Sequence, residues 1–177
     1  MRKRKNSIRH TLVVNLTVFV SCICALLILQ STVVFNGYIP SESMENTLMK
    51  GNRFLGNRLA YKSGKTPKRY DVIVFYAPDA PGTIYIKRVI GLPGEKIEVK
   101  NGEVYADGKR TSLSFIKEPM DKDENLSFKV PTGHYFVMGD NRNDSFDSRY
   151  WDNPYVPEKN IIAKAVFRYI GGFSVIH

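Results

Sequence analysis

Two serines separated by one residue follow a proline, and their spacing suits nucleophilic chemistry. The stretch runs from Pro40 through Ser41 to Ser43. If the extended backbone that proline favours continues, the side chains of Ser41 and Ser43 point to the same face. One hydroxyl could then attack a carbonyl carbon while the other stabilises the resulting oxyanion. The alternative is an ordinary polar loop, where this serine spacing is common.

A lysine lies in the middle of an apolar segment that predicts a β-strand. Over residues 83–90 side chains alternate between two faces, so Tyr85, Lys87 and Val89 share one face. If that face is buried, desolvation disfavours the ammonium and lowers the pKa of Lys87. Lowering a lysine pKa by about 2 from 10.4 requires roughly 2.7 kcal/mol. Such an amine can act as a general base near neutral pH. The alternative is a lysine that faces solvent.

The segment 139–151 interleaves carboxylates with guanidinium groups. Its alternating members are Asp140, Arg142, Asp147 and Arg149. Paired carboxylates and guanidiniums can brace a turn. An EF-hand calcium loop is excluded, because neither register, from Asp140 or from Asn141, places glycine at the sixth position. The alternative is a solvated polar loop.

An apolar segment near the N-terminus predicts a membrane anchor. Residues 11–35 contain no Asp, Glu, Lys or Arg, and residues 12–35 are predominantly apolar. A helix over these positions is about 36 Å long, which spans a hydrocarbon core of roughly 30 Å. A cleaved signal peptide is the alternative, but it has a shorter apolar region and a small-residue cleavage site. We therefore expect an uncleaved anchor at 11–35, preceded by a basic tail at 1–10.

The distribution of charge predicts an orientation and argues against a nucleic-acid partner. Five of the nine net positive charges lie before the apolar segment, at Arg2, Lys3, Arg4, Lys5 and Arg9. These charges predict a cytoplasmic N-terminus and an extracytoplasmic domain at 36–177 in a single-pass protein of the cell membrane. That domain carries only a small net positive charge, without the basic stripe and interleaved aromatics of nucleic-acid-binding proteins.

The cysteines and histidines do not indicate a metal site or a disulfide. Both cysteines, Cys22 and Cys24, lie in the apolar segment. The three histidines are scattered along the chain, so we expect no metal and no other cofactor. His134 could serve as the base of a Ser/His/Asp triad, but nothing in the sequence marks it for that role.

The rest of the chain predicts a mostly β, antiparallel domain with a barrel-like sheet. The Asn101-Gly102 pair predicts a type I′ turn between strands at 96–100 and 103–106. Residues 110–128 are polar and irregular, so we expect a surface excursion there. The other predicted strands lie within 51–58, 71–76, 83–90, 134–138 and 161–170.

Taken in order, three of these segments resemble the bacterial type I signal peptidases (leader peptidases), membrane-bound Ser/Lys proteases that remove signal peptides. The resemblance extends from the anchor to the last predicted strand, and Asp71-Val72-Ile73-Val74-Phe75 adds to it. The three motifs are Ile39-Pro40-Ser41-Glu42-Ser43-Met44 with Thr47-Leu48, Tyr85-Ile86-Lys87-Arg88-Val89-Ile90-Gly91-Leu92-Pro93-Gly94, and Gly139-Asp140-Asn141-Arg142 with Ser145-Phe146-Asp147-Ser148-Arg149-Tyr150-Trp151.

The resemblance implies a role for each site residue. Ser43 is implied to be the nucleophile and Lys87 the general base, with Ser145 holding the Lys87 amine. The Ser41 hydroxyl and the Ser43 backbone N–H are implied to form the oxyanion hole. Arg88, Asp140, Arg142, Asp147 and Arg149 are implied to support the site. The implied substrates are preproteins with signal peptides, bound extended in a groove at the bilayer and cut after an Ala-x-Ala sequence.

The chain departs from the family pattern at four positions. Asn46 replaces the usual proline, Asn52 the usual aspartate, Asp144 the usual asparagine and Asp152 the usual glycine. We expect a looser turn at Asn46, and Asn46 is the first residue to revert to proline if an Ala-x-Ala preprotein is not cleaved. The short segment 95–138 predicts a small insertion beside the core.

Two other functions are compatible with parts of the sequence. A signal-peptidase-like assembly or chaperone protein would bind partners without cleaving them, and it would not need both Ser43 and Lys87. A self-cleaving relative of SOS-type repressors should carry a DNA-binding domain, whereas this chain has an apolar segment in that place.

Overall fold

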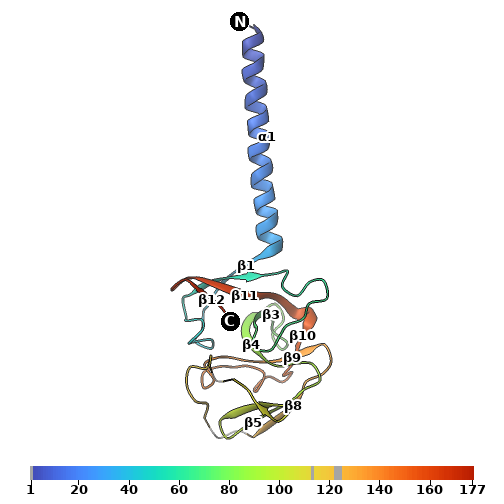
Figure 1. Ribbon diagram of the computed structural model, residues 1–177, viewed down its shortest axis with the longest axis vertical. Helices are drawn as coiled ribbons and strands as arrows, with labels where there is room; N and C mark the ends of the chain where they lie inside the picture. The colour runs from blue at the N-terminus through green and yellow to red at the C-terminus, as the bar shows by residue number, and fades with distance from the viewer. Residues whose placement is uncertain (1, 113, 122–124) are drawn as a thin grey trace. The chain divides into compact units, whose positions relative to one another are not determined.

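The computed structural model describes residues 2–112, 114–121 and 125–177, and the side chains from residue 10 onward within those ranges. The chain divides into two compact units between Val34 and Phe35. The first unit contains a single helix, α1 (Arg2–Val33), drawn in blue in Figure 1. Its segment His10–Val33 is long and apolar enough to cross a membrane. The helix thus ends two residues before the predicted limit, because Val34 already belongs to strand β1.

The second unit is mostly antiparallel β-sheet, as the sequence predicted, and its strands form two separate sheets. The larger sheet has the order β1-β2-β11-β3-β4-β9-β10, and β12 pairs with β11. Every pairing from β2 to β10 is antiparallel. Its strands are β1 (Val34–Tyr38), β2 (Arg53–Asn57), β3 (Val72–Tyr76), β4 (Ile84–Gly91), β9 (His134–Met138), β10 (Val156–Pro157), β11 (Ile161–Ile170) and β12 (Ser174–Val175), with a 3-10 turn, η1 (Glu158–Asn160), before β11.

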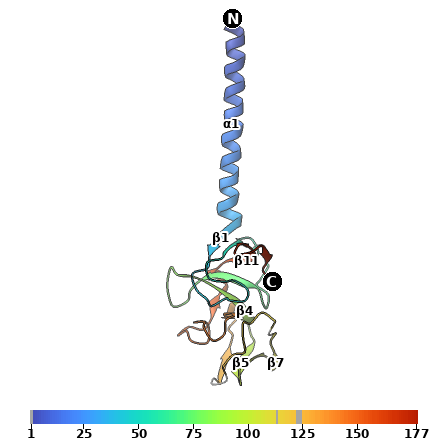
Figure 2. The same cartoon turned by 90° about the vertical axis from the view of Figure 1, so that its left-hand side faces the viewer.

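The smaller sheet lies at the opposite end of this unit from β11 (Figures 1 and 2). Its order is β7-β6-β5-β8. The Asn101-Gly102 turn has positive φ at both residues, 53° and 75°, as the predicted type I′ turn requires. Its strands are β5 (Lys96–Lys100), β6 (Glu103–Ala106), β7 (Lys109–Arg110) and β8 (Leu126–Lys129).

Two sequence-based expectations about the domain need correction. Residues 110–128 are not wholly a surface excursion, since they contain the start of β8, and Met120 and Phe115 pack against the core of the smaller sheet. The strand at 161–170 is not the last one, because the chain turns back at Gly171 and Gly172 and adds β12. Polar composition concealed the first feature, and β12 is too short to produce a periodic pattern.

The apolar core positions the two segments that carry candidate chemistry. Met44 and Leu48 are fully buried in one cluster with Val72 and Val74 of β3. A second cluster contains Val89 of β4 with residues of β3 and β9. The turn after Pro40 and the strand β4 are therefore both fixed to β3, on which they converge.

Candidate active site

Strand β4 places two adjacent cationic side chains on opposite faces of the larger sheet. Lys87 pairs with Ile73 of β3, and Arg88 pairs with Met138 of β9. Lys87 is 5% exposed and Arg88 is 1% exposed. Because successive side chains of a strand point to opposite faces, each cation has its own surroundings.

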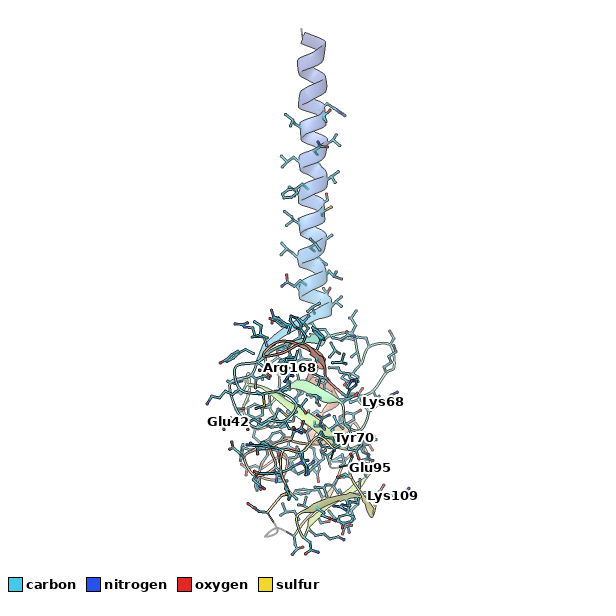
Figure 3. The ribbon with its side chains drawn as sticks, turned by 60° about the vertical axis from the view of Figure 1, so that its left-hand side comes forward. Glu42, Lys68, Tyr70, Glu95, Lys109 and Arg168 are labelled. Carbon is cyan, nitrogen blue, oxygen red and sulfur yellow. The ribbon has the colours of Figure 1, made fainter. Side chains whose placement is uncertain are left out.

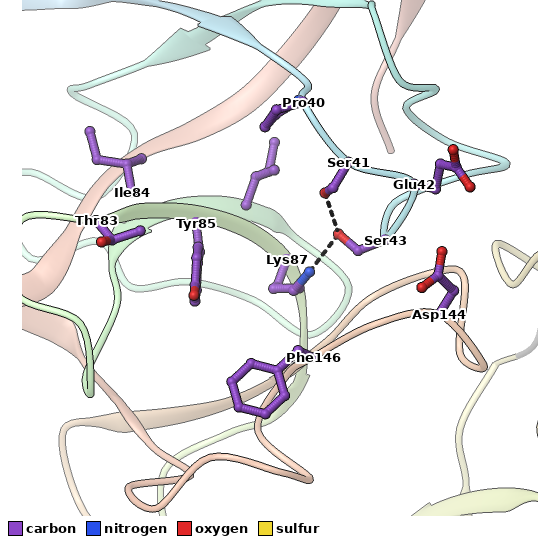
Figure 4. Close-up of a pocket in the computed structure, with 11 residues that line it drawn as sticks. Pro40, Ser41, Glu42, Ser43, Thr83, Ile84, Tyr85, Lys87, Asp144 and Phe146 are labelled. Carbon is purple, nitrogen blue, oxygen red and sulfur yellow. Dashed lines mark hydrogen bonds between the residues drawn. The ribbon is translucent and has the colours of Figure 1, made fainter.

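The turn that carries Ser43 brings its hydroxyl to the Lys87 face. Lys87 Nζ lies 2.5 Å from Ser43 Oγ, although the two residues are 44 positions apart. Ser41 Oγ lies 3.3 Å from Ser43 Oγ. Figure 4 shows the three groups in one line of contacts. The nucleophile and base suggested by the sequence are therefore in direct contact.

The backbone around the serines is not extended, contrary to the assumption made from Pro40. Residues 41–48 form bends and turns, in which Glu45 N–H donates to Glu42 O at 3.0 Å and Leu48 N–H donates to Met44 O at 2.7 Å. The two hydroxyls therefore meet within bends and turns, and their contact does not come from a strand period of two.

Burial changes the acid–base behaviour of Lys87. Desolvation lowers the pKa of Lys87 from 10.5 to about 8, although the carboxylate of Asp147 acts in the opposite direction. With a pKa of about 8, roughly a tenth of the amine is neutral at pH 7 and about half at pH 8. A neutral amine at hydrogen-bond distance from a serine hydroxyl can accept its proton.

Ser145 lies near this pair but makes a different contact from the one implied. Its Oγ donates to Asp147 Oδ2 at 2.7 Å, and no hydrogen bond joins it to Lys87 among the described residues. A Cβ at Gly139 would collide with both Ser145 Oγ and the Ser43 carbonyl oxygen. Glycine at 139 therefore lets the loop that carries Ser145 pack directly against the turn at 41–48, which carries the candidate nucleophile Ser43 and is called the nucleophile turn below.

The acidic and basic residues of segment 139–151 form the expected pairs only in part. Arg149 binds Asp147 through Nε at 2.8 Å and Nη2 at 3.0 Å. Burial alone would raise the pKa of Asp147, but the hydrogen bonds from Arg149 and others hold it below its usual value. Asp140 binds Arg88 instead of a neighbour in sequence, at 2.8 and 2.7 Å.

Arg142 differs from the other arginines of the site. Its Nε donates to Gly139 O at 3.1 Å, and within the described residues it forms no ion pair. Burial lowers the pKa of Arg142 to about 10. Arg142 therefore braces the loop backbone, and it does not neutralise a carboxylate by direct contact.

Three residues support the site through contacts that the sequence analysis did not predict. Thr47 Oγ1 donates to Asp140 Oδ2 at 2.5 Å and accepts from Arg88 Nη2 at 2.9 Å. The Asn46 amide donates to the carbonyls of Phe115 and Ile116 at 3.1 and 3.3 Å. Asn141 binds the nucleophile turn through its amide and its backbone N–H. Their positions within the motifs were the available signal.

The pocket around Ser43 and Lys87 has an apolar side and an acidic side. Figure 4 shows Ile84 and Tyr85 on one side of Ser43, with Glu42 and Asp144 on the other. His134 does not line this pocket, and its Nδ1 contacts the carbonyl of Thr132 at 2.9 Å. The lining residues are Pro40, Ser41, Glu42, Ser43, Thr83, Ile84, Tyr85, Ile86, Lys87, Asp144 and Phe146.

Arg168 of β11 contacts the turn that carries Ser43 from outside the pocket. Figure 3 labels Arg168, together with Glu42, among the side chains of this unit. Arg168 donates to Thr47 O at 3.3 Å and to Asn52 Oδ1 at 3.4 Å, so it also supports the nucleophile turn. In the described ranges, no group of three or more His, Cys, Asp or Glu side chains is arranged to hold a metal ion.

Comparison with known proteins identifies the family of this chain. Residues 11–170 match the protein family described as signal peptidase, peptidase S26. The chain belongs to the signal peptidase family. The probable signal peptidase I-1 of Synechocystis sp. is 40% identical over 163 residues, which are 88% of this chain and 81% of that protein.

Other members of the family show similar likeness. The signal peptidase I of Pseudomonas aeruginosa is 36% identical over 186 residues, covering 78% of this chain and 66% of that protein. The signal peptidase I V of Bacillus subtilis is 39% identical over 143 residues, covering 73% and 82%. The crystal structure of a signal peptidase I from Enterococcus faecalis matches with a TM-score of 0.48 at 34% identity, over 56% of this chain and 97% of that chain.

Proposed function

We propose that this chain is a membrane-anchored serine endopeptidase that removes signal peptides, with Ser43 as nucleophile and neutral Lys87 as general base. The observation that carries the proposal is the 2.5 Å contact between Lys87 Nζ and Ser43 Oγ at a buried site. Relatives that bear the name signal peptidase I support the substrate class. A protein that only binds partners has no use for a buried lysine with a lowered pKa next to a serine hydroxyl.

The proposed reaction begins with proton transfer from Ser43 to Lys87. As Ser43 Oγ attacks the scissile carbonyl carbon, the neutral Lys87 amine accepts the hydroxyl proton. The carbonyl oxygen becomes an oxyanion, stabilised by the Ser41 hydroxyl and the Ser43 N–H. The C–N bond then breaks, Lys87 passes its proton to the leaving amine, and an ester joins the signal peptide to Ser43. Water activated by Lys87 hydrolyses this ester.

The supporting groups position the pair without taking part in bond making. Asp147, held by Arg149, fixes Ser145 beside the nucleophile turn. Asp140, held by Arg88, receives the Thr47 hydroxyl of the same turn. The proposed role of Ser145 is to limit the space around the Lys87 amine, with its hydroxyl available to the amine when it rotates away from Asp147.

The proposed substrate is a preprotein whose signal peptide ends in an Ala-x-Ala-like sequence. An extended peptide added beside strand residues near Ile84 would place alternate side chains against the apolar side of the pocket. Small side chains suit a shallow apolar surface. The helix α1 is proposed to anchor the chain in the bilayer with its N-terminus in the cytoplasm and the domain outside.

The test uses the full-length protein in detergent with a preprotein whose signal ends in Ala-x-Ala. The expected result is a new N-terminus directly after the second alanine, identified by mass spectrometry. Ser43→Ala should abolish the cut while circular dichroism and thermal unfolding remain close to those of the unmodified chain. Cleavage that persists in Ser43→Ala contradicts the assignment. Binding of the preprotein without any cleavage by the unmodified chain favours the assembly role.

A further inference from the structure

The peptide bond between Glu42 and Ser43 is held by a residue of the loop that follows β9. Asn141 donates its side-chain Nδ2 to Glu42 O at 3.2 Å. The Asn141 backbone N–H donates to Ser43 O at 3.1 Å. Asn141 is 1% exposed, so water does not compete for these contacts. One buried residue therefore binds two successive carbonyl groups of the nucleophile turn.

The planarity of the peptide bond converts this contact into control of an N–H group. The chain has no cis peptide among its described residues, and in a trans peptide the C=O and N–H groups point in opposite directions. Fixing the Glu42 carbonyl therefore fixes the direction of the Ser43 N–H. Glu45 N–H also donates to Glu42 O, at 3.0 Å, so the carbonyl has two donors.

The Ser43 N–H itself is left available. Within residues 2–112, 114–121 and 125–177, it donates to no protein acceptor. It lies in the residue whose hydroxyl contacts Lys87 Nζ. An N–H that is fixed in direction and has no protein partner can donate to a ligand oxygen without reorganisation, which is what makes such donors effective in catalysis.

The hydrogen bonds of Asn141 also argue against a purely stabilising role. Its Oδ1 is buried and has no hydrogen-bond partner among the described residues. Leaving a buried acceptor unpaired costs about 1–3 kcal/mol. A side chain without this unpaired oxygen would therefore make the folded protein more stable than asparagine does. Its useful contact is the one that its NH2 group makes with the Glu42 carbonyl.

We propose that Asn141 is a positioning residue that aligns the Glu42–Ser43 peptide, so that the Ser43 N–H points at the oxyanion. The inference rests on the proposed peptidase function. In it, Asn141 acts only by holding the backbone of Glu42 and Ser43. Asn141 touches neither the Lys87 amine nor the Ser43 hydroxyl in the contacts of the described residues. Its loss should weaken transition-state stabilisation and leave substrate binding and the base unchanged.

The experiment compares Asn141→Ala and Asn141→Asp with the unmodified full-length protein in detergent. Both changes remove the Nδ2 donor, and the aspartate keeps the shape of the side chain. We expect kcat for preprotein cleavage to fall about 10- to 100-fold, with KM within about threefold. In Asn141→Ala the pH at which activity rises should stay the same, because no charge near Lys87 changes. In Asn141→Asp it should move to higher pH, because a further carboxylate raises the pKa of Lys87. Asn143→Ala is the matched control, because Asn143 lies in the same loop but its amide binds Glu118 and Pro119.

A transition-state mimic provides the readout that a merely structural role would not move. The mimic is a signal peptide whose C-terminal carboxyl group is replaced by an aldehyde. Ser43 Oγ adds to the aldehyde carbon, the hydroxyl proton passes to Lys87, and the aldehyde oxygen becomes a hemiacetal oxyanion. Its affinity should fall in both Asn141 variants by about the same factor as kcat/KM. Ground-state binding is measured with the intact preprotein and with each Asn141 variant combined with Ser43→Ala. The affinity for the preprotein should fall by less than the affinity for the aldehyde, because the neutral carbonyl of the uncleaved substrate carries no oxyanion charge. Asn143→Ala should stay within about twofold in every measurement.

The results separate this inference from the proposed function. Full kcat and full aldehyde affinity in both Asn141 variants would overturn it, as would a loss of preprotein affinity equal to the loss of aldehyde affinity. A shifted pH limb in Asn141→Ala would assign the effect to Lys87 instead. If Asn141→Asp fails to fold, Asn141→Ala decides alone, because it places no carboxylate against the Glu42 carbonyl. No cleavage by the unmodified chain, with aldehyde binding equal to that of Ser43→Ala, would refute the peptidase function itself.

Discussion

Lys87 and Arg88 are neighbours on one strand, are both buried, and have opposite electrostatic surroundings. The Lys87 amine contacts the Ser43 hydroxyl, and burial lowers its pKa to about 8. Arg88 binds both oxygens of Asp140 and donates to the Tyr70 carbonyl. The ring of Phe115 lies 4.3 Å from the Arg88 guanidinium.

The difference shows that charge compensation, rather than burial, separates a candidate base from a structural cation. The carboxylate that most strongly opposes the lowered pKa of Lys87 is Asp147, and Asp147 is already bound to Arg149 and Ser145. Burying Lys87 without a contacting carboxylate among the described residues lowers the stability of the protein but keeps the amine able to accept a proton. Arg88, which is paired with Asp140, stabilises the opposite face of the sheet.

Removing the Lys87 amine should have the largest effect on activity and an opposite effect on stability. We expect Lys87→Met to lower the cleavage rate by about 10³-fold or more, because the general base is lost. At pH 7 the same variant should be more stable by about 1–3 kcal/mol, since it no longer buries a group that prefers to be charged. The measurements are preprotein cleavage and urea unfolding followed by circular dichroism.

The pH dependence of that stability gain has a definite sign. The pKa of Lys87 is lowered from 10.5 to about 8 on folding, so the destabilisation is fully present below pH 8 and disappears as pH approaches 10.5. The advantage of Lys87→Met should disappear over the same range. A variant less stable than the unmodified chain at pH 7 would contradict the assignment of Lys87 as an uncompensated buried amine.

Removing the Arg88 guanidinium should mainly lower the stability of the protein. Arg88→Met leaves Asp140 buried without its partner, and we expect a loss of about 3–5 kcal/mol in the free energy of unfolding. Arg88→Lys is the control that keeps the charge but cannot form the two-point contact with Asp140, so its loss should be smaller. Equal unfolding midpoints for Arg88→Met and the unmodified chain would remove the contrast between the two faces.

The turn at Asn46 supports the Ser43 segment through its backbone conformation and not through charge. Asn46 has φ of 85°, which proline cannot adopt because its ring fixes φ near −65°. We therefore expect Asn46→Pro to destabilise the protein by more than about 1 kcal/mol. Asn46→Gly keeps the backbone and loses only the amide contacts, so it should cost about 0.5–1.5 kcal/mol. A higher unfolding temperature for Asn46→Pro than for Asn46→Gly would refute the claim that the positive φ of Asn46 is needed in this turn.

The smallest predicted effect concerns an exposed carboxylate at the edge of the pocket. Activity should rise with pH through about 8, where the Lys87 amine becomes neutral. The charge of Asp144 raises the pKa of Lys87, so Asp144→Asn should move this rise a few tenths of a pH unit lower. The measurement is the pH profile of kcat/KM at constant ionic strength, and a rise displaced to higher pH would contradict the sign.

The local features of the fold were predictable because they depend on neighbouring residues. Apolar runs marked β3 and β9, and the Asn101-Gly102 pair marked the hairpin turn through its positive φ angles. The apolar segment indicated the helix that α1 forms, with an error of two residues at its end. Turns and strand periods act over a few residues, so they leave a trace in the sequence.

The partners of the charged groups were not predictable in the same way. The sequence suggested that Asp140 would pair within its own segment, but the register of β4 on β9 brings Arg88 to it from 52 positions away. Ser145 was expected at the Lys87 amine and binds Asp147. Asn141 gave no signal, because its role depends on the backbone direction of a turn that lies 98 positions earlier at Ser43.

By itself, the sequence determined the antiparallel strand pattern, the apolar helix, and the serine and lysine residues able to react. Only the tertiary structure decided that Lys87 Nζ meets Ser43 Oγ and that Arg88 binds Asp140. It also decided that no carboxylate among the described residues forms an ion pair with Lys87. The physical reason is that residue type and period set local conformation, whereas desolvation and ion pairing depend on which distant segments strand register brings together.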